Sequence, residues 1–186
     1  MVNSNDLIRD FVNTLHKDPR GDEEELGDPA ALTGWLRERG LLAAGAAARP
    51  GELRRAVELR EALRVLLLAN NDVDVDTGPA FSVLDDAARR GRVMLRFAGG
   101  APSLEPEAAG VAGALGRIAA AVHVAVADGS WHRLKACRAD DCEWAFVDTA
   151  RNQSRAWCSM RSCGNREKAR AFRRRHTGQT APARRA

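Results

Sequence analysis

Hydrophobic residues in the first 130 positions recur with helical periodicity. The segment 5–16 carries apolar side chains one and four residues apart, namely Leu7, Ile8, Phe11, Val12 and Leu15. This spacing predicts an amphipathic helix over residues 5–16, with Ser4 or Asn5 as its N-cap. The stripe is the first of several that together indicate a helical domain.

A second helix is bounded by clear start and stop signals. Asp28 followed by Pro29 is typical of a helix N-terminus, and Gly40 suits the left-handed position that follows a helix C-terminus. Three residues of this segment are expected to face the core: Leu32, Trp35 and Leu36.

Three longer patterns predict further helices. They run from Leu53 to about Asn70, from Thr77-Gly78-Pro79 to Gly91, and from Val111 to Val126 before Asp128-Gly129. In the last of them, Gly113 and Gly116 allow another helix to approach closely. The segment 108–127 is long and apolar, but alanine and glycine contribute little to membrane insertion. Because Arg117 also lies near its middle, we expect a core helix and no membrane span.

One hairpin and one charged face complete this part. Residues 93–97 alternate as in a strand, and Gly99-Gly100 offers a turn into a partner around 102–104. Arg60, Glu61 and Arg64 are spaced as on a solvated helix face.

The sequence shows no pairing of a nucleophile with a general base, so we expect that the protein is not an enzyme. Residues 1–130 are therefore expected to form a mainly α-helical domain with a small β-hairpin, able to fold alone.

The four cysteines of the chain carry its strongest chemical signal. They form two close pairs, Cys137-x4-Cys142 and Cys158-x4-Cys163, separated by 15 residues. Each pair places two thiolates on a tight turn, and the insert lets the second turn fold back onto the first. This arrangement predicts one tetrahedral Zn²⁺ bound by all four sulfurs. Since no coordination position remains for water or substrate, the metal is expected to be structural.

Two alternatives compete with zinc at these cysteines. Iron binds four thiolates in a rubredoxin-like site, and two disulfides also need an even cysteine count. The N-terminal sequence MVNSNDLIRDFVNTLH lacks the basic and apolar regions of a secretory signal, so a cytoplasmic location is expected. A reducing cytosol favours metal over disulfide.

The residues around the cysteines predict a short hairpin and a basic helix. Residues 143–148 suit a strand, residues 151–155 a turn, and 156–157 the return to Cys158. Three aromatic residues here could form the small core of the module or stack on unpaired bases: Trp144, Phe146 and Trp157. Core packing is the favoured interpretation.

After Cys163 a helix is expected, with Asn165 as N-cap and His176 near its end. Its apolar side, with Ala169 and Phe172, is expected to pack on the cysteine knuckle and its arginine side to face solvent. Arg166 is an exception that could pair with Asp148. The predicted contacts to nucleic acid are Arg151, Arg155, Arg166, Arg170, Arg173 and Arg174.

The net charge changes sign between the helical part of the chain and the cysteine-containing part. Residues 133–186 contain 14 lysines and arginines against 5 aspartates and glutamates, a net charge of +9, whereas residues 1–132 carry −5. Four thiolates on one Zn²⁺ subtract about two charges, which leaves the module at about +7. A small basic zinc module indicates nucleic-acid binding, because phosphate charge supplies most of the binding free energy. The expected organisation is a domain at 1–130, a zinc module at 131–176 and a flexible basic tail at 177–186.

These motifs resemble a known family. The residues Trp157-Cys158-Ser159-Met160 and Cys163-Gly164-Asn165-Arg166, with Cys137, Cys142 and Phe146-Val147-Asp148, are similar to the bacterial CGNR zinc fingers, although Thr149-Ala150 stands where a serine is expected. The segments 11–14, 35–36 and 59–64 resemble the domain that usually precedes this finger, named Putative stress-induced transcription regulator. The resemblance implies a four-cysteine zinc site in a treble-clef-like module and a role in DNA-dependent regulation.

Three functions follow as alternatives. The first is a transcriptional regulator whose finger binds DNA, with a first domain that dimerises or senses a small-molecule or protein signal. The second is a zinc-stabilised module that docks on an acidic protein. The third is an RNA-binding protein that stacks bases on its tryptophans. DNA is preferred to RNA as the partner, and no membrane partner is expected.

Overall fold

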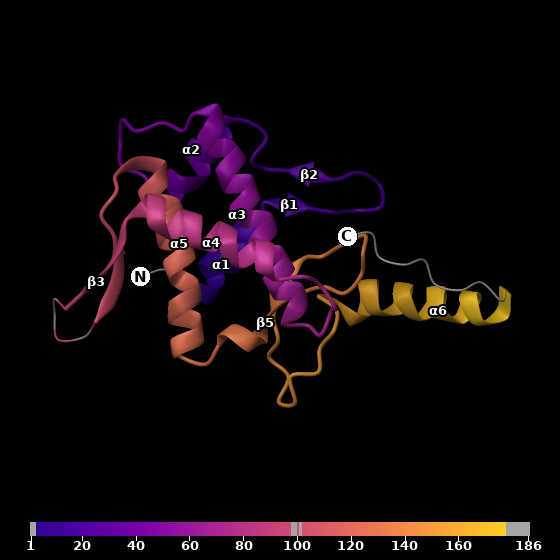
Figure 1. Cartoon of the computed structure of the whole chain (residues 1–186). Coiled ribbons are helices and arrows are strands. Elements are labelled where there is room, and N and C mark those ends of the chain that lie inside the picture. The colour runs from indigo at the N-terminus through magenta and orange to yellow at the C-terminus, as the bar shows by residue number, and fades with distance from the viewer. Residues whose placement is uncertain (1–2, 98–99, 101, 178–186) are drawn as a thin grey trace.

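Helices dominate the chain in the computed structural model, which describes residues 3–97, 100 and 102–177 (Figure 1). The helical part contains α1 (Ser4–Val12), β1 (Leu15–His16), β2 (Glu23–Glu24), α2 (Pro29–Glu38), α3 (Pro50–Ala69), α4 (Gly78–Gly91), β3 (Val93–Arg96), β4 (Ser103–Pro106) and α5 (Gly110–Ala127). The last third contains η2 (Trp131–Arg133), β5 (Leu134–Ala136), β6 (Ala145–Val147), the π-helical turn η3 (Met160–Gly164) and α6 (Asn165–Thr177). Most of the expected tail, residues 178–186, lies outside the described residues.

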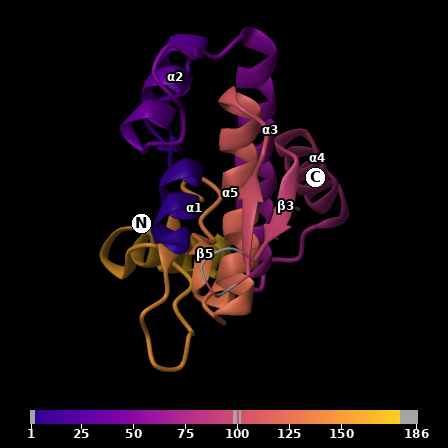
Figure 2. The same cartoon turned by 90° about the vertical axis from the view of Figure 1, so that its left-hand side faces the viewer.

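Within the described residues, the strands form antiparallel pairs: β1 with β2, β3 with β4 and β5 with β6. The predicted hairpin at 93–97 is confirmed, and its partner strand is β4 with Leu95 opposite Leu104. Gly99 of the predicted turn lies outside the described residues. The β3–β4 hairpin and α6 project from opposite ends of the molecule (Figure 1), and Figure 2 shows α3 and α5 running side by side through its centre.

The predicted second helix and its cap are confirmed. Asp28 accepts a hydrogen bond from the Ala31 amide at 2.8 Å, so it is the N-cap of α2. Gly40 follows the helix with φ of +66°, a conformation that glycine adopts without steric cost. The expected core residues Leu32, Trp35 and Leu36 are buried.

The predicted first helix is too long. α1 begins after Asn3, whose side chain accepts from the Asn5 amide, and it ends at Val12. Leu15 belongs to β1 and pairs with Glu24. Helical periodicity continues to Leu15, but Asn13 leaves the helix to bond with Ala145, which is 132 positions away in the sequence. A distant contact therefore sets the end of this helix.

The predicted close approach in the last long helix is confirmed for Gly116 and not for Gly113, where an added Cβ would meet the Ala108 carbonyl that precedes the same helix. A Cβ on Gly116 would lie 2.8 Å from the Cα of Gly91, so α4 and α5 cross where both helices have glycine. Among the described residues, α5 alone is long and apolar enough to span a membrane by length and composition, and half of it is buried within the protein. It packs against α1, α3 and α4 as a core helix.

The hydrophobic core crosses the expected domain boundary. Leu134, Ala136 and Ala145 of the β5–β6 pair belong to the same buried cluster as Phe11 of α1 and Leu63 of α3. Two asparagines reinforce this contact. Asn71 donates to the carbonyls of Ala136 and Ala156 at 2.7 and 2.9 Å, and Asn13 bonds to both backbone groups of Ala145. The zinc module thus completes the core of the helical domain, which argues against the expectation that residues 1–130 fold alone.

The predicted solvated face on α3 is wrong. Arg60 and Arg64 are each only 2% exposed and are among the largest fully buried side chains. Arg60 forms two hydrogen bonds of 2.6 and 2.8 Å with the Glu24 carboxylate, and Arg64 donates to the carbonyls of Val12 and Glu143 at 2.9 and 3.0 Å. Glu61 bonds to both arginines. The arginines thus join α3 to α1, to the β1–β2 hairpin and to the cysteine knuckle.

Candidate metal centre

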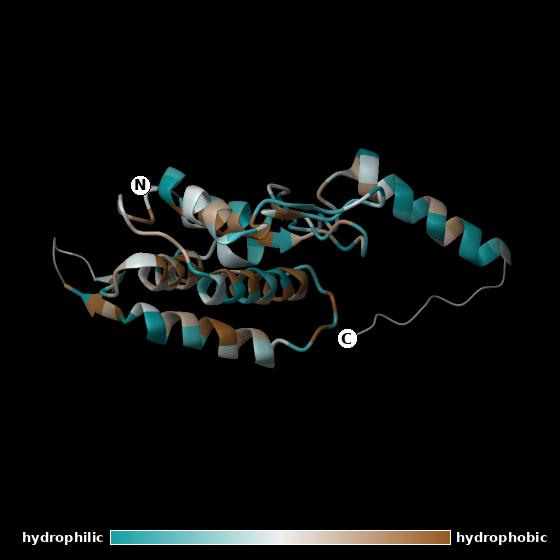
Figure 3. Cartoon of the chain, turned by 90° about the horizontal axis from the view of Figure 1, so that it is seen from above, coloured by the Kyte–Doolittle hydropathy of each residue, from teal (hydrophilic) through white to brown (hydrophobic). Residues whose placement is uncertain are grey.

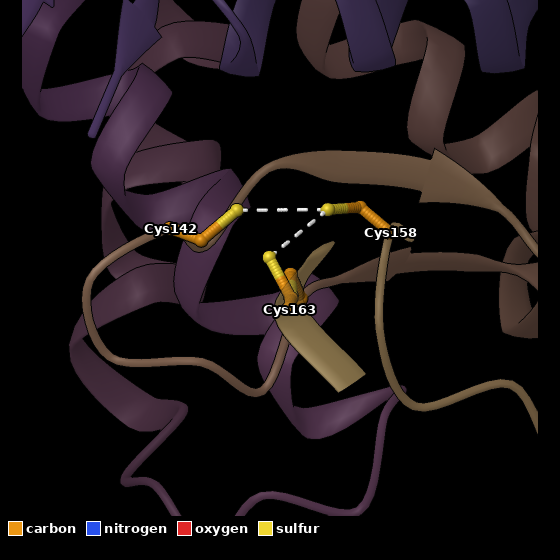
Figure 4. A group of neighbouring side chains, drawn as sticks. Cys142, Cys158 and Cys163 are labelled. Atoms are coloured by element: carbon orange, nitrogen blue, oxygen red, sulfur yellow. Dashed lines mark hydrogen bonds between the residues drawn. The ribbon is translucent and has the colours of Figure 1, made fainter. Parts of the chain in front are cut away.

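The four predicted cysteines meet at one point. Cys137 follows β5, Cys142 precedes β6, Cys158 ends the long loop after β6, and Cys163 lies in η3. Their sulfur atoms all lie within 4.8 Å of one another. Figure 4 shows Cys142, Cys158 and Cys163 pointing toward one another from these separate segments.

The sulfur distances fit a tetrahedral ion. Cys158 Sγ lies 3.6 Å from Cys142 Sγ and 3.7 Å from Cys163 Sγ. Four sulfurs bound ~2.3 Å from a tetrahedral zinc ion are about 3.8 Å apart. A disulfide requires ~2.05 Å, and all four cysteines are free thiols. The geometry therefore favours the metal over the disulfide alternative.

Hydrogen bonds to sulfur prepare the cluster for a cation. Bonds from Cys142 and Cys158 lower the pKa of the Cys137 thiol to about 2, and backbone amides of Ala139 and Cys158 add to this. The same contact with Cys137 raises the pKa of Cys142 and raises that of Cys158 to about 12. The thiols therefore titrate as one coupled group, and a divalent cation would take the place of their protons.

Comparison with known families agrees with this geometry. Residues 5–129 match the ABATE family, described as Putative stress-induced transcription regulator, and residues 133–176 match the CGNR zinc finger. The chain belongs to the ABATE family and carries a CGNR zinc finger. A search of curated proteins finds no match. The metal of the four-cysteine cluster is zinc, and four sulfur ligands fill its tetrahedral coordination.

A buried ion pair links β5 of the CGNR finger to the residue that follows β6. Lys135 Nζ lies 2.8 Å from Asp148 Oδ2, and both side chains are almost fully buried. Burial alone would raise the pKa of Asp148, but the Lys135 ammonium and the Ala150 and Arg155 amides lower it. Asp148 therefore holds the loop that follows β6. It does not pair with Arg166, so that predicted contact is wrong.

Asp141 is the actual partner of Arg166. It lies just before Cys142, and its two oxygens are 2.9 Å from Arg166 and 2.5 Å from Arg170. Burial opposes ionisation of this carboxyl, but the bond from Arg170 and the charge of Arg166 outweigh burial and lower its pKa. Arg166 also donates to Cys163 Sγ at 3.4 Å. Asp141 thus fastens the first turns of α6 to the first cysteine pair.

Replacing Asp141 with asparagine tests this connection. We expect a decrease of about 1–2 kcal/mol in the free energy of unfolding, because Arg166 loses its carboxylate partner and Arg170 keeps only Glu167. Zinc content should stay at one equivalent. Hydrogen exchange should accelerate in α6 but not in α5. Asp74→Asn, which removes the same charge from an exposed loop, serves as control, and equal melting temperatures for the two variants would contradict the assignment.

The basic helix is turned differently from the prediction. Asn165 is not its N-cap, because η3 continues directly into α6 and Ser159 caps that turn by accepting from the Ser162 amide. The half-buried side of α6 carries Arg166, Arg170 and Arg174, while Ala169 and Phe172 are exposed. Phe172 is 56% exposed, and its ring stacks beside the His176 ring, with centres 4.0 Å apart. The expected apolar docking face thus points to solvent.

The six arginines predicted for nucleic acid fall into two groups. Arg166 and Arg170 are bound to Asp141, and Arg155 donates to the Trp157 and Cys158 carbonyls while its guanidinium lies 4.8 Å from the Phe146 ring centre. The second group is Arg151, Arg173 and Arg174, and exposure does not separate it from the first, because Arg155 is also exposed and Arg166 and Arg170 are partly exposed. These contacts tie the first group into the finger, and contact of any of the six arginines with nucleic acid stays a prediction.

Three cations outside the predicted set are also exposed: Arg161 in η3, and Lys168 and Arg175 in α6. Lys168 and Arg175 are seven residues apart, so they lie on one face of the helix with Phe172 between them. Figure 3 shows α6 as mostly hydrophilic along its length. Periodicity alone assigned this face to the core because it contains Phe172.

The aromatic residues of the finger mainly pack within it. Phe146 is buried against the cysteine cluster, and Trp144 and Trp157 are half-buried beside it. Trp144 also meets the edge of His16, with ring centres 5.0 Å apart. Core packing, the favoured interpretation from the sequence, is what the structure contains.

Proposed function

We propose that this ABATE protein is a cytoplasmic transcriptional regulator whose CGNR finger binds DNA through the exposed face of α6. The observation that carries the proposal is the position of α6, which projects from the body of the protein with several cations toward solvent (Figure 1). The finger is strongly basic and the helical domain acidic, so phosphate charge is attracted to one end only. The family description, a transcription regulator, supports the same role.

One part of the finger anchors α6 and another part of α6 is exposed, which supports a binding surface on this helix. Zinc, Asp141 and the β5–β6 pair hold the helix at its first turns, and its later turns extend into solvent. An exposed helix of this kind reaches a DNA groove while its support stays outside. No reaction is proposed, because zinc has no open coordination position.

Reversing the charge at two exposed positions of α6 tests DNA binding. In the variant Lys168→Glu/Arg175→Glu we expect affinity for duplex DNA to fall about tenfold or more at low salt. The slope of log K against log salt should decrease by about 0.9 for each phosphate that the finger no longer neutralises. Fluorescence anisotropy with labelled duplexes measures both quantities.

The matched control is Arg54→Glu/Arg89→Glu, which makes the same charge change on exposed positions of α3 and α4. The control should bind DNA with nearly the parent salt slope. Equal binding by both double variants would contradict the proposed surface. Tighter binding of single-stranded RNA than of duplex DNA would favour the RNA alternative, and no binding to either would favour a protein partner for the exposed Phe172.

A further inference from the structure

A second concave site lies on the helical domain. A groove of about 370 Å³ opens between the start of α1, the end of α2, β4 and α5. This volume is in the range of small-molecule sites, roughly 300–1,000 Å³. None of the zinc ligands lines it. Its walls therefore need an explanation separate from the finger.

The lining combines apolar walls with charge of one sign. Six apolar side chains form most of the surface: Leu7, Leu41, Leu104, Ala120, Ala121 and Val124. The charged residues of the lining are Arg39 and Arg117, and among the described residues no acidic side chain lines the groove. The surrounding segment 1–132 has a net charge of −5, so an all-cationic lining runs against the composition of the domain.

Among the described residues, Arg39 has one long ion pair, with Glu38, and Arg117 has none. Arg117 is exposed on α5 and makes no ion pair within the part of the chain that the structure describes. Arg39 lies over the Trp35 ring, 3.9 Å from its centre, and its carboxylate partner is the exposed Glu38 at 3.8 Å. Arg39 Nη1 also donates to the Trp35 carbonyl at 3.4 Å, so the other N–H groups of Arg39 and those of Arg117 can donate hydrogen bonds to an anion in the groove, in the planar geometry that suits a carboxylate.

We propose that this groove binds a small carboxylate with an apolar body. The carboxylate lies between Arg39 and Arg117, and the hydrocarbon part covers the leucines and the alanine stripe of α5. Val124, which is 45% exposed at the rim, is buried by the ligand. A free phosphate lacks the part that would cover the apolar walls, and a neutral alcohol lacks the charge that would engage the arginines.

The groove is connected to the finger through α1. Leu7 of this helix lines the groove, and Asn13, which directly follows the helix, bonds to both backbone groups of Ala145 in β6. One short rigid helix thus touches the proposed ligand at one end and the zinc finger at the other. This placement suits the sensing role expected of the helical domain.

Calorimetry and thermal unfolding of the zinc-loaded full chain test the site without nucleic acid, so the outcome is independent of DNA binding. The probes are octanoate below its micelle concentration, octanol with the same tail, and inorganic phosphate. We expect octanoate to bind and raise the melting temperature. Octanol and phosphate should bind at least about tenfold more weakly, because octanol lacks the negative charge and phosphate lacks the apolar body.

Three variants locate the site. Arg117→Gln should weaken the affinity for octanoate at least about tenfold, and Val124→Glu should abolish binding. Arg54→Gln, at an exposed position of α3, should bind octanoate like the parent. Arg117 is exposed, so its variant is expected to fold, and it decides the matter if Val124→Glu does not. Absence of octanoate binding at millimolar concentration, unchanged affinity in Arg117→Gln, or equal binding of octanol or phosphate would each overturn the proposal.

Discussion

Removal of zinc is expected to destabilise the whole chain and not only its last third. Cys163→Ser removes one ligand, and chelation removes the ion. Structural zinc sites contribute ~10–16 kcal/mol at neutral pH, which is comparable to the entire stability of an ordinary domain, about 5–15 kcal/mol. Leu134, Ala136 and Ala145 complete the core of α1 and α3. Unfolding of the finger therefore exposes the core of the helical domain to water as well.

The expected result is a fall of at least about 10 °C in a single cooperative melting transition, given about 2–4 °C for each kcal/mol in a chain of this size. Circular dichroism with metal analysis measures it. Ser162→Ala, in the same turn but with no bond to sulfur, should melt like the parent. A helical-domain transition that keeps its midpoint after chelation would contradict the continuous core and restore the view of two independent units.

Arg64→Ala is expected to have the second largest effect. The guanidinium donates to the Val12, Leu15 and Glu143 carbonyls and pairs with Glu61 at 2.9 Å. Removing it leaves buried carbonyl acceptors without a donor and leaves Glu61 with Arg60 as its charged partner, which together cost about 3–5 kcal/mol. The melting temperature should fall by about 6–20 °C. Arg54→Ala, on the exposed side of the same helix, should change it little.

The same pair makes stability depend on pH. Burial alone would raise the pKa of Glu61, but the charges and hydrogen bonds of Arg64 and Arg60 lower it in the folded protein. A carboxyl whose folded pKa is lowered stabilises the protein above its unfolded pKa and loses this contribution as pH falls. The stability of the parent against denaturant should therefore decrease on acidification below about pH 4.5. Arg64→Ala should show a smaller acid dependence, and an unchanged dependence would contradict this assignment.

The sequence by itself determined the zinc ligands and most helices, because both depend on near neighbours. Two cysteine pairs with short internal spacing bind one ion wherever their turns meet. The Asp28 cap and Gly40 act within one turn of α2. The Gly113-x-x-Gly116 spacing indicated a close helix approach, although only the structure identified Gly91 as the partner of Gly116.

Tertiary structure decided which polar residues are buried and which face of α6 is free. Arg60 and Arg64 resemble a solvated helix face in sequence, but they are buried because Glu24 and the Glu143 carbonyl, both far away along the chain, satisfy them. Asp141 turns Arg166 and Arg170 toward the knuckle and leaves Phe172 exposed. Periodicity reflects only the order of hydrophobic and polar residues along one element. A charged partner on another element offsets the cost of burying an arginine, and periodicity gives no information on that partner.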